Sequence, residues 1–165
     1  MLVGYAEHLP RRKIDIENME QSANIFLKTR EYVIHSNSRN IDGLWIASPP
    51  YYKLSTETDF EEVFKAIKDA LNSTKHSLPR LSITDLADDA YLKALKFKSL
   101  RDLYKDARLS IIVLKDNMLS ILPTKKLGVA KGFSHLNAQI VHVSINSNID
   151  EIKKAFSKAF SKCEG

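Results

Sequence analysis

YKLSTETDFEEVFKAIKDAL at residues 52–71 and VHVSINSNIDEIKKAFSKAF at residues 141–160 carry the pattern that decides the fold. In both stretches an alternating, strand-like lead is followed by apolar residues at helical spacing. The two align without a gap, so that Ser55 meets Ser144 and Glu62 meets Glu151. The alignment favours a structural duplication, although any two amphipathic helices that follow strands share part of this spacing. Each half then consists of several antiparallel strands followed by one helix.

The remaining elements are assigned from local patterns. Thr58 and Glu61 match a capping box and predict the start of the first helix, and the second is expected from about 148 to 163. LSIIVL (109–114) and MLSIL (118–122) flank Lys115, Asp116 and Asn117, a combination typical of a β-hairpin. Further segments are a helix at 20–30, strands at 31–36, 44–46, 51–55 and 140–145, and a turn at 36–43; residues 92–104 fit helix, strand or both.

These elements predict an α+β fold with mainly antiparallel sheets in two pseudo-repeated strand–helix halves. We expect a single domain over 1–165, with approximate halves at 26–76 and 92–163, because 165 residues is an ordinary size for one domain. In the expected packing two antiparallel sheets face each other and the two helices cover an open edge.

The composition is that of a soluble protein from a reducing compartment. Cys163 is the single cysteine, which excludes an internal disulfide framework and a multi-cysteine zinc site. The segment MLVGYAEHLPRRK does not resemble a signal peptide, and no stretch approaches the roughly 20 apolar residues that cross a bilayer. The expected localisation is therefore cytoplasmic.

Motifs for catalysis are missing from the sequence. No two of the five histidines stand three or four residues apart, and no phosphate loop or nucleophile elbow occurs. We therefore expect no enzymatic activity, no cofactor and no metal.

The charge of +5 is unevenly distributed, with +1 over 1–53, −4 over 54–91 and +8 over 92–165. A basic chain suggests nucleic acid as a partner, but binders of single strands interleave basic groups with exposed aromatic rings. Here Phe97, Tyr104 and Phe133 are the nearby candidates, and each fits a core position equally well. The acidic stretch instead favours a basic protein partner.

Two stretches resemble the CdiI immunity proteins of bacterial contact-dependent growth inhibition systems. One is DGLWIASPPYYKL (42–54) with the EEVFKAIKDAL helix after it, and the other runs from Lys96 to Phe133, where a short lead-in precedes the hairpin and a proline. Together the likeness covers most of 26–163. It implies a protein that binds the toxic C-terminal domain of its own cell's surface effector and neutralises it in the cytosol.

Some immunity proteins resemble the Whirly fold of single-stranded-DNA-binding proteins, which has two four-stranded sheets with a helix after each. The resemblance therefore also implies an alternative, a Whirly-like single-stranded nucleic-acid-binding protein. The lysine-and-glycine strand signature of plant Whirly proteins is not evident, and KGFSH (131–135) is only a faint echo of it.

The toxin-binding surface is expected at the acidic stretch between the halves. Acidic rim charges would steer a basic toxin domain, and a neighbouring tyrosine would anchor it, because tyrosine is enriched at binding hot spots. A solvated loop with the tyrosine in the core explains the same stretch. The candidate partner-binding residues are Glu57, Glu61, Asp85, Asp88, Asp89 and Tyr91.

Overall fold

The computed structural model describes residues 20–80, 89–128 and 131–165. These residues form eight strands, four α-helices and a short 3₁₀ helix. In chain order the elements are β1 (Gln21–Leu27), β2 (Glu31–Asn40), β3 (Trp45–Ser55), α1 (Phe60–Asn72), β4 (His76–Leu78), α2 (Asp89–Leu95), α3 (Leu100–Tyr104), β5 (Arg108–Lys115), β6 (Met118–Gly128), β7 (Gly132–His135), η3 (Asn137–Gln139), β8 (Val141–Ser144) and α4 (Ile149–Ser161).

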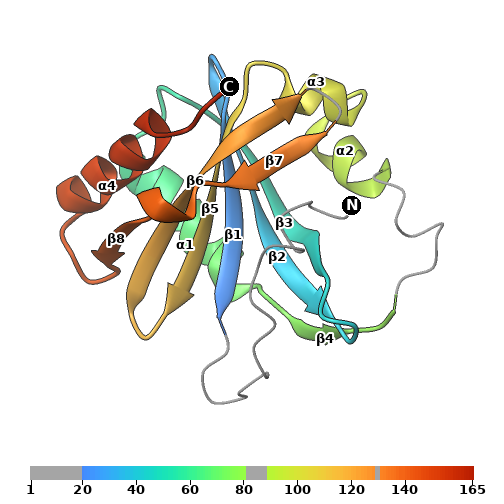
Figure 1. Cartoon of the computed structure of the whole chain (residues 1–165), viewed down its shortest axis with the longest axis horizontal. Coiled ribbons are helices and arrows are strands. Elements are labelled where there is room, and N and C mark those ends of the chain that lie inside the picture. The colour runs from blue at the N-terminus through green and yellow to red at the C-terminus, as the bar shows by residue number, and fades with distance from the viewer. Residues whose placement is uncertain (1–19, 81–88, 129–130) are drawn as a thin grey trace.

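The predicted α+β class with mainly antiparallel strands is confirmed, but the strands form one sheet where two facing sheets were expected. Their order is β3-β2-β1-β5-β6-β7, and β8 pairs with the first part of β6 (Figure 1). The two predicted sheets are joined because β1 pairs directly with β5 along its whole length, from Gln21 to Leu27. Among the named strands of the described residues, β4 alone pairs in parallel, beside the end of β2.

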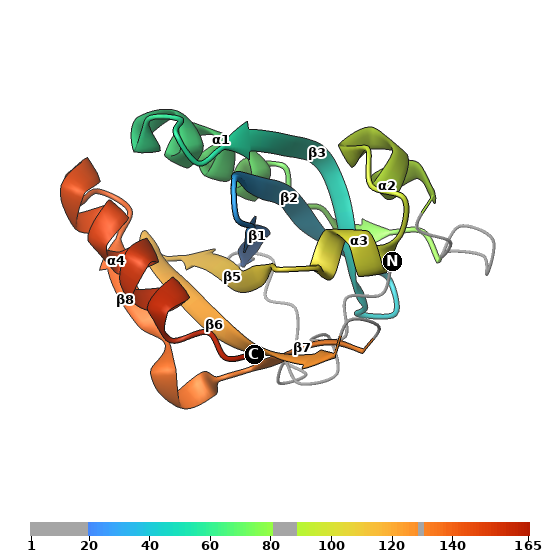
Figure 2. The same ribbon diagram turned by 90° about the horizontal axis from the view of Figure 1, so that it is seen from above.

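Helices cover both faces of this sheet (Figure 2). On one face α1 and α4 pack through side chains such as Ile67 and Phe156 onto Ile25 and Ile112. On the other face α2 and α3 pack onto a second apolar cluster that includes Phe26 and Leu109. Because successive residues of a strand point to opposite faces, β1 supplies both clusters and reads as a nearly continuous buried stretch.

That double burial explains one wrong prediction. Residues 20–30 were expected to be helical, yet Gln21–Leu27 is a strand in the middle of the sheet. A central strand covered on both faces loses the period-two alternation that identifies half-buried strands. By contrast, the hairpin of β5 and β6 is confirmed, with Asp116 and Asn117 at φ of 50° and 62° in its turn. Those angles are typical of a type I′ turn.

The segment between β2 and β3 also differs from the prediction. β2 continues to Asn40, so the expected turn at 36–43 shrinks to its last residues. β3 runs unbroken through Pro49 and Pro50, which stand at a bulge between the paired residues Ser48 and Tyr51. A proline has no N–H to donate, so a bulge is where a strand tolerates it.

The two long helices lie where the helical spacing placed them, but their N-termini are capped differently. Asn148 accepts a hydrogen bond from the Glu151 backbone N–H at 2.9 Å, as a side-chain N-cap. The capping box predicted from Thr58 and Glu61 is wrong, since Asp59 is the N-cap of α1 and makes no side-chain capping bond. The uncertain stretch 92–104 belongs to two short helices, α2 and α3.

Candidate functional site

The structure describes four of the six predicted contact residues. Glu57 is exposed in the turn after β3, and Glu61 is exposed in the first turn of α1. Asp89 is the first residue of α2, whereas Asp85 and Asp88 lie outside the described residues. Because α1 and α2 cover opposite faces of the sheet, the helices that carry Glu61 and Asp89 lie on different faces.

The predicted anchor Tyr91 lies in the core. Its side chain is 4% exposed and packs from α2 onto the sheet, edge-on to the imidazole of His35 with ring centroids 5.3 Å apart. The ring of Tyr51 on β3 is 5.6 Å away. In this position Tyr91 fastens α2 to the sheet and offers almost no surface to a partner.

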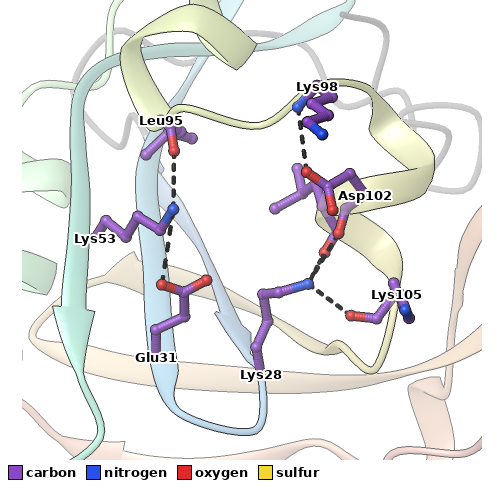
Figure 3. Close-up of polar contacts among 8 residues, drawn as sticks. Lys28, Glu31, Lys53, Leu95, Lys98, Asp102 and Lys105 are labelled. Carbon is purple, nitrogen blue, oxygen red and sulfur yellow. Dashed lines mark hydrogen bonds and ion pairs between the residues drawn. The ribbon is translucent and has the colours of Figure 1, made fainter.

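Lys28 holds α3 against the end of the sheet (Figure 3). Its Nζ donates to three backbone carbonyls at the C-terminal end of α3, those of Asp102 at 3.0 Å, Leu103 at 2.8 Å and Lys105 at 2.6 Å. These carbonyls have no partner within the helix, and a positive charge there also opposes the helix dipole. Burial lowers the pKa of Lys28 from its usual 10.5.

Lys53 on β3 holds the C-terminal end of α2 against the sheet. Its Nζ donates to the carbonyl of Leu95 at 3.2 Å and lies 3.8 Å from a carboxylate oxygen of Glu31 (Figure 3). The same ammonium lies 4.2 Å from the centre of the Phe97 ring, a cation–π contact. The two lysines therefore serve to position the α2–α3 layer, and their charges are engaged within the protein.

A row of polar side chains crosses β1 and β2 on the face of the sheet that α2 and α3 cover. The Asn37 side-chain amide donates to Asn24 Oδ1 at 2.7 Å and to Ser22 Oγ at 3.1 Å. His35, two residues before Asn37, is fully buried, and its Nδ1 lies 2.8 Å from the Ser36 carbonyl oxygen. Desolvation lowers the pKa of His35 from 6.5 to about 4, so the imidazole is neutral at pH 7.

Nucleic-acid binding by base stacking would need exposed aromatic rings beside the lysines. Phe97, Tyr104 and Phe133 are all buried in the cluster under α2 and α3. The lysines of α4, such as Lys154 and Lys158, are exposed on the opposite face of the sheet. These three rings therefore do not form a stacking platform with the basic residues.

In the described ranges, no group of three or more His, Cys, Asp or Glu side chains is placed so that it could hold a metal ion. Among the helices of those same ranges, none is both long and apolar enough to span a membrane.

The sequence reasoning missed a set of exposed large apolar side chains. Within the described residues these are Ile41, Leu44, Met118 and Leu127. Met118 and Leu127 stand alone at the two ends of β6, which is ordinary for a soluble surface. Ile41 and Leu44 share one tight turn between β2 and β3. The available signal was the pair of apolar residues flanking Asp42 and Gly43 in a segment otherwise composed of turn formers.

No protein-family model matches the chain, and neither does any curated protein sequence. The chain shares its fold with solved structures that include the following two. A protein of unknown function from Neisseria meningitidis, NMB0488, is 20% identical, with a TM-score of 0.70 over 88% of this chain and 96% of that one. A chain of the CdiA-CT/CdiI toxin and immunity complex from Yersinia pseudotuberculosis is 18% identical, with a TM-score of 0.72 over 88% and 98%. At these identities the likeness concerns the fold.

Proposed function

We propose that this chain is an immunity protein, which binds the C-terminal toxin domain of a cognate contact-dependent growth inhibition effector and neutralises it in the cytoplasm. The observation that carries the proposal is the fold shared with a chain of a CdiA-CT/CdiI toxin and immunity complex, over 98% of that chain. The sequence resemblance to CdiI proteins supports the same function, and it rests on the residues of the 42–54 and 96–133 stretches, which is independent of the comparison of folds.

In this proposal the chain acts by binding the toxin domain and catalyses no reaction of its own. In support, the lysines that approach aromatic rings on the α2–α3 face are engaged in helix capping, and the buried histidine is neutral and packed among rings. Polar groups used in this way hold the fold together. The alternative, a Whirly-like single-stranded nucleic-acid-binding protein, loses support from the burial of Phe97, Tyr104 and Phe133.

We further infer that the two strand–helix halves are related by an internal duplication. The support is the strand register: Ile25 faces Ile34 in the β1–β2 hairpin, and adding 87 to each number gives Ile112 and Ile121, which face each other in the β5–β6 hairpin. The strand–helix segments that contain Ser55 and Ser144 align at an offset of 89, so the second half has two more residues between its hairpin and that segment. The β1–β5 pairing fits the same relation, because Ala23 faces Ile112 while Ile25 faces Ser110. A pseudo-twofold relation of this kind requires both hairpins to use equivalent residues at their shared border.

The proposal predicts that a large secreted adhesin-like effector is encoded immediately upstream, and the test uses the toxin domain of that effector. That domain is expressed from an inducible promoter in a bacterial host, with this chain, with a non-cognate immunity protein, or alone. We expect growth to be rescued only by this chain, and a stable one-to-one complex on gel filtration. Toxicity that persists while this chain is folded and abundant, with no complex at micromolar concentrations, contradicts the proposal. A gene neighbourhood consisting only of metabolic enzymes would also count against it.

A further inference from the structure

The turn between β2 and β3 is held in shape by hydrogen bonds of Asn40, from both its side chain and its main chain. The side-chain oxygen of Asn40 accepts from the backbone N–H groups of Asp42 and Leu44, both at 2.9 Å. The Asn40 main chain closes the loop in both directions, its N–H donating to the Leu44 carbonyl and its carbonyl accepting from Gly43, each at 3.0 Å. Gly43 adopts φ of +82°, which a residue with a side chain rarely tolerates. We call residues 40–44 the β2–β3 tip.

The tip is tied to the chain that follows β4. The Arg80 guanidinium binds the Asp42 carboxylate through two hydrogen bonds, both of 2.9 Å, and this pairing lowers the pKa of Asp42. The backbone N–H of Ile41 donates to the Leu78 carbonyl at 2.9 Å. A fork-shaped pair of this kind fixes geometry even where its net energy is small. The tip is therefore anchored at two points to one segment, the end of β4 and the residues just after it.

This fixed turn presents two apolar side chains to solvent. Ile41 is 62% exposed and Leu44 is 37% exposed. The next residue, Trp45, is buried; the Arg39 guanidinium carbon lies 5.2 Å from the centre of its ring, and the His76 ring meets it edge-on at 6.1 Å. Trp45 therefore offers no surface to a partner, whereas Ile41 and Leu44 are two exposed apolar side chains in a loop that loses little entropy on binding, which suits them to anchor an interface.

The charges bordering the tip describe its partner. Arg39, Lys75 and Arg80 supply three positive groups, against the carboxylates of Glu20 and Asp42. Arg39 and Glu20 both act on His76, and the Lys75 carbonyl accepts from the Arg39 backbone N–H at 2.8 Å. Arg80 and Asp42 neutralise each other, so among the described residues Arg39 and Lys75 stand against Glu20, an excess of one positive charge, and two copies of this patch would repel each other in a symmetric contact. A surface with acidic groups around an apolar recess fits better.

We propose that the β2–β3 tip inserts Ile41 and Leu44 into an apolar, acid-rimmed recess of the toxin domain. The inference rests on the proposed immunity function and names the surface that performs it. The tip is convex and rigid, so its complement is concave, and many ligand and substrate sites of proteins are concave. Occupying such a recess blocks it sterically. The acidic residues Glu57 and Glu61 have no part in this contact.

The test measures binding of the upstream effector's toxin domain to purified full-length variants by surface plasmon resonance. Ile41→Asp and Leu44→Asp are compared with Met118→Asp and Leu127→Asp, which place the same charge at similarly exposed apolar positions elsewhere. We expect each tip variant to weaken binding by about 30-fold or more, as for hot-spot residues, and each control by about twofold or less. Lys75→Glu should slow association at low salt, and Lys158→Glu on α4 should not.

The outcomes separate the two proposals. Thermal unfolding of each variant confirms that the fold is retained; should an aspartate variant unfold, Ile41→Ser replaces it in the comparison. If wild-type protein binds and protects but the tip variants bind equally well, the tip inference is overturned and the immunity function stands. If wild-type protein neither binds nor protects, both fall. A wild-type dimer that Ile41→Asp converts to monomer would assign the tip to self-association and overturn the inference.

Discussion

Acidification should destabilise this protein through His35. The side chain is fully buried, among the rings of Phe26, Tyr51 and Tyr91, and its Nδ1–H donates to the Ser36 carbonyl at 2.8 Å. Burial lowers its pKa from 6.5 to about 4. In the unfolded chain the same histidine binds a proton below about pH 6.5, whereas in the folded protein it stays neutral down to about pH 4.

The direction and the magnitude of the stability change with pH follow from this difference in pKa between the folded and unfolded states. Between the two pKa values the unfolded state binds more protons, so the free energy of unfolding falls as the pH falls. The His35 contribution is fully present above pH 6.5 and fully lost below about pH 4. At about 1.4 kcal/mol per pH unit, the loss is about 2 kcal/mol at pH 5 and about 3 kcal/mol in all.

The assay is urea unfolding from pH 7.5 to pH 4.5 for wild type, His35→Gln and a control, His142→Gln. His142 is exposed on β8, so the control should keep the wild-type pH dependence. His35→Gln should be less stable at pH 7.5 but should lose about 2 kcal/mol less than wild type on going to pH 5. Parallel curves for wild type and His35→Gln would refute the reasoning. A proton NMR titration in which His35 titrates near pH 6.5 in the folded protein would refute it independently.

Two further predictions concern the helix ends. Lys28→Met removes three charged hydrogen bonds to the end of α3 and should lower the free energy of unfolding in urea by about 2–3 kcal/mol. Lys53→Met should lower it by about 1 kcal/mol, because the Lys53 amine reaches one carbonyl. Equal losses for the two variants would contradict the capping role. Asn148→Ala should cost about 1 kcal/mol because it removes the N-cap bond of α4, whereas Asp59→Ala at the uncapped start of α1 should cost about half of that or less. If Asp59→Ala proves the more damaging, the assignment of the two caps is mistaken.

The parts of the fold that could be predicted are those where the local sequence pattern agrees with the final packing. The helices α1 and α4 each bury one stripe, and the β5–β6 hairpin has turn residues suited to its backbone, so local pattern and tertiary packing agree there. β1 was missed because its alternation covers only Ser22–Ile25 before the apolar run Ile25–Leu27, and because no turn formers suited to a hairpin flank it as they flank β5 and β6. The continuation of β2 through Ser36 and Ser38 depends on partners outside the strand, such as Lys75, whose backbone N–H donates to the Ser38 hydroxyl at 3.0 Å.

The candidate site was less predictable for a physical reason. Charge runs are visible in a sequence, and they led to Glu57, Glu61 and Asp89, of which the last two lie on helices that cover separate faces of the sheet. Whether an apolar residue is exposed depends on what packs against it, and the turn formers around Ile41 indicate a turn without showing that its side chain is exposed. Tyr91 illustrates the converse, because a tyrosine beside acidic residues became a core residue once α2 docked onto the sheet.

The position of β3 at one end of the strand order has a consequence for the behaviour of the protein at high concentration. A terminal strand offers its unpaired backbone to any passing chain, and long, flat edges of this kind seed aggregation. In β3 the bulge and the consecutive Pro49 and Pro50 interrupt that edge near its middle. Two successive residues there cannot donate to an added strand. A foreign strand could align with only a few residues on either side, so this border of the sheet resists fibril-like stacking.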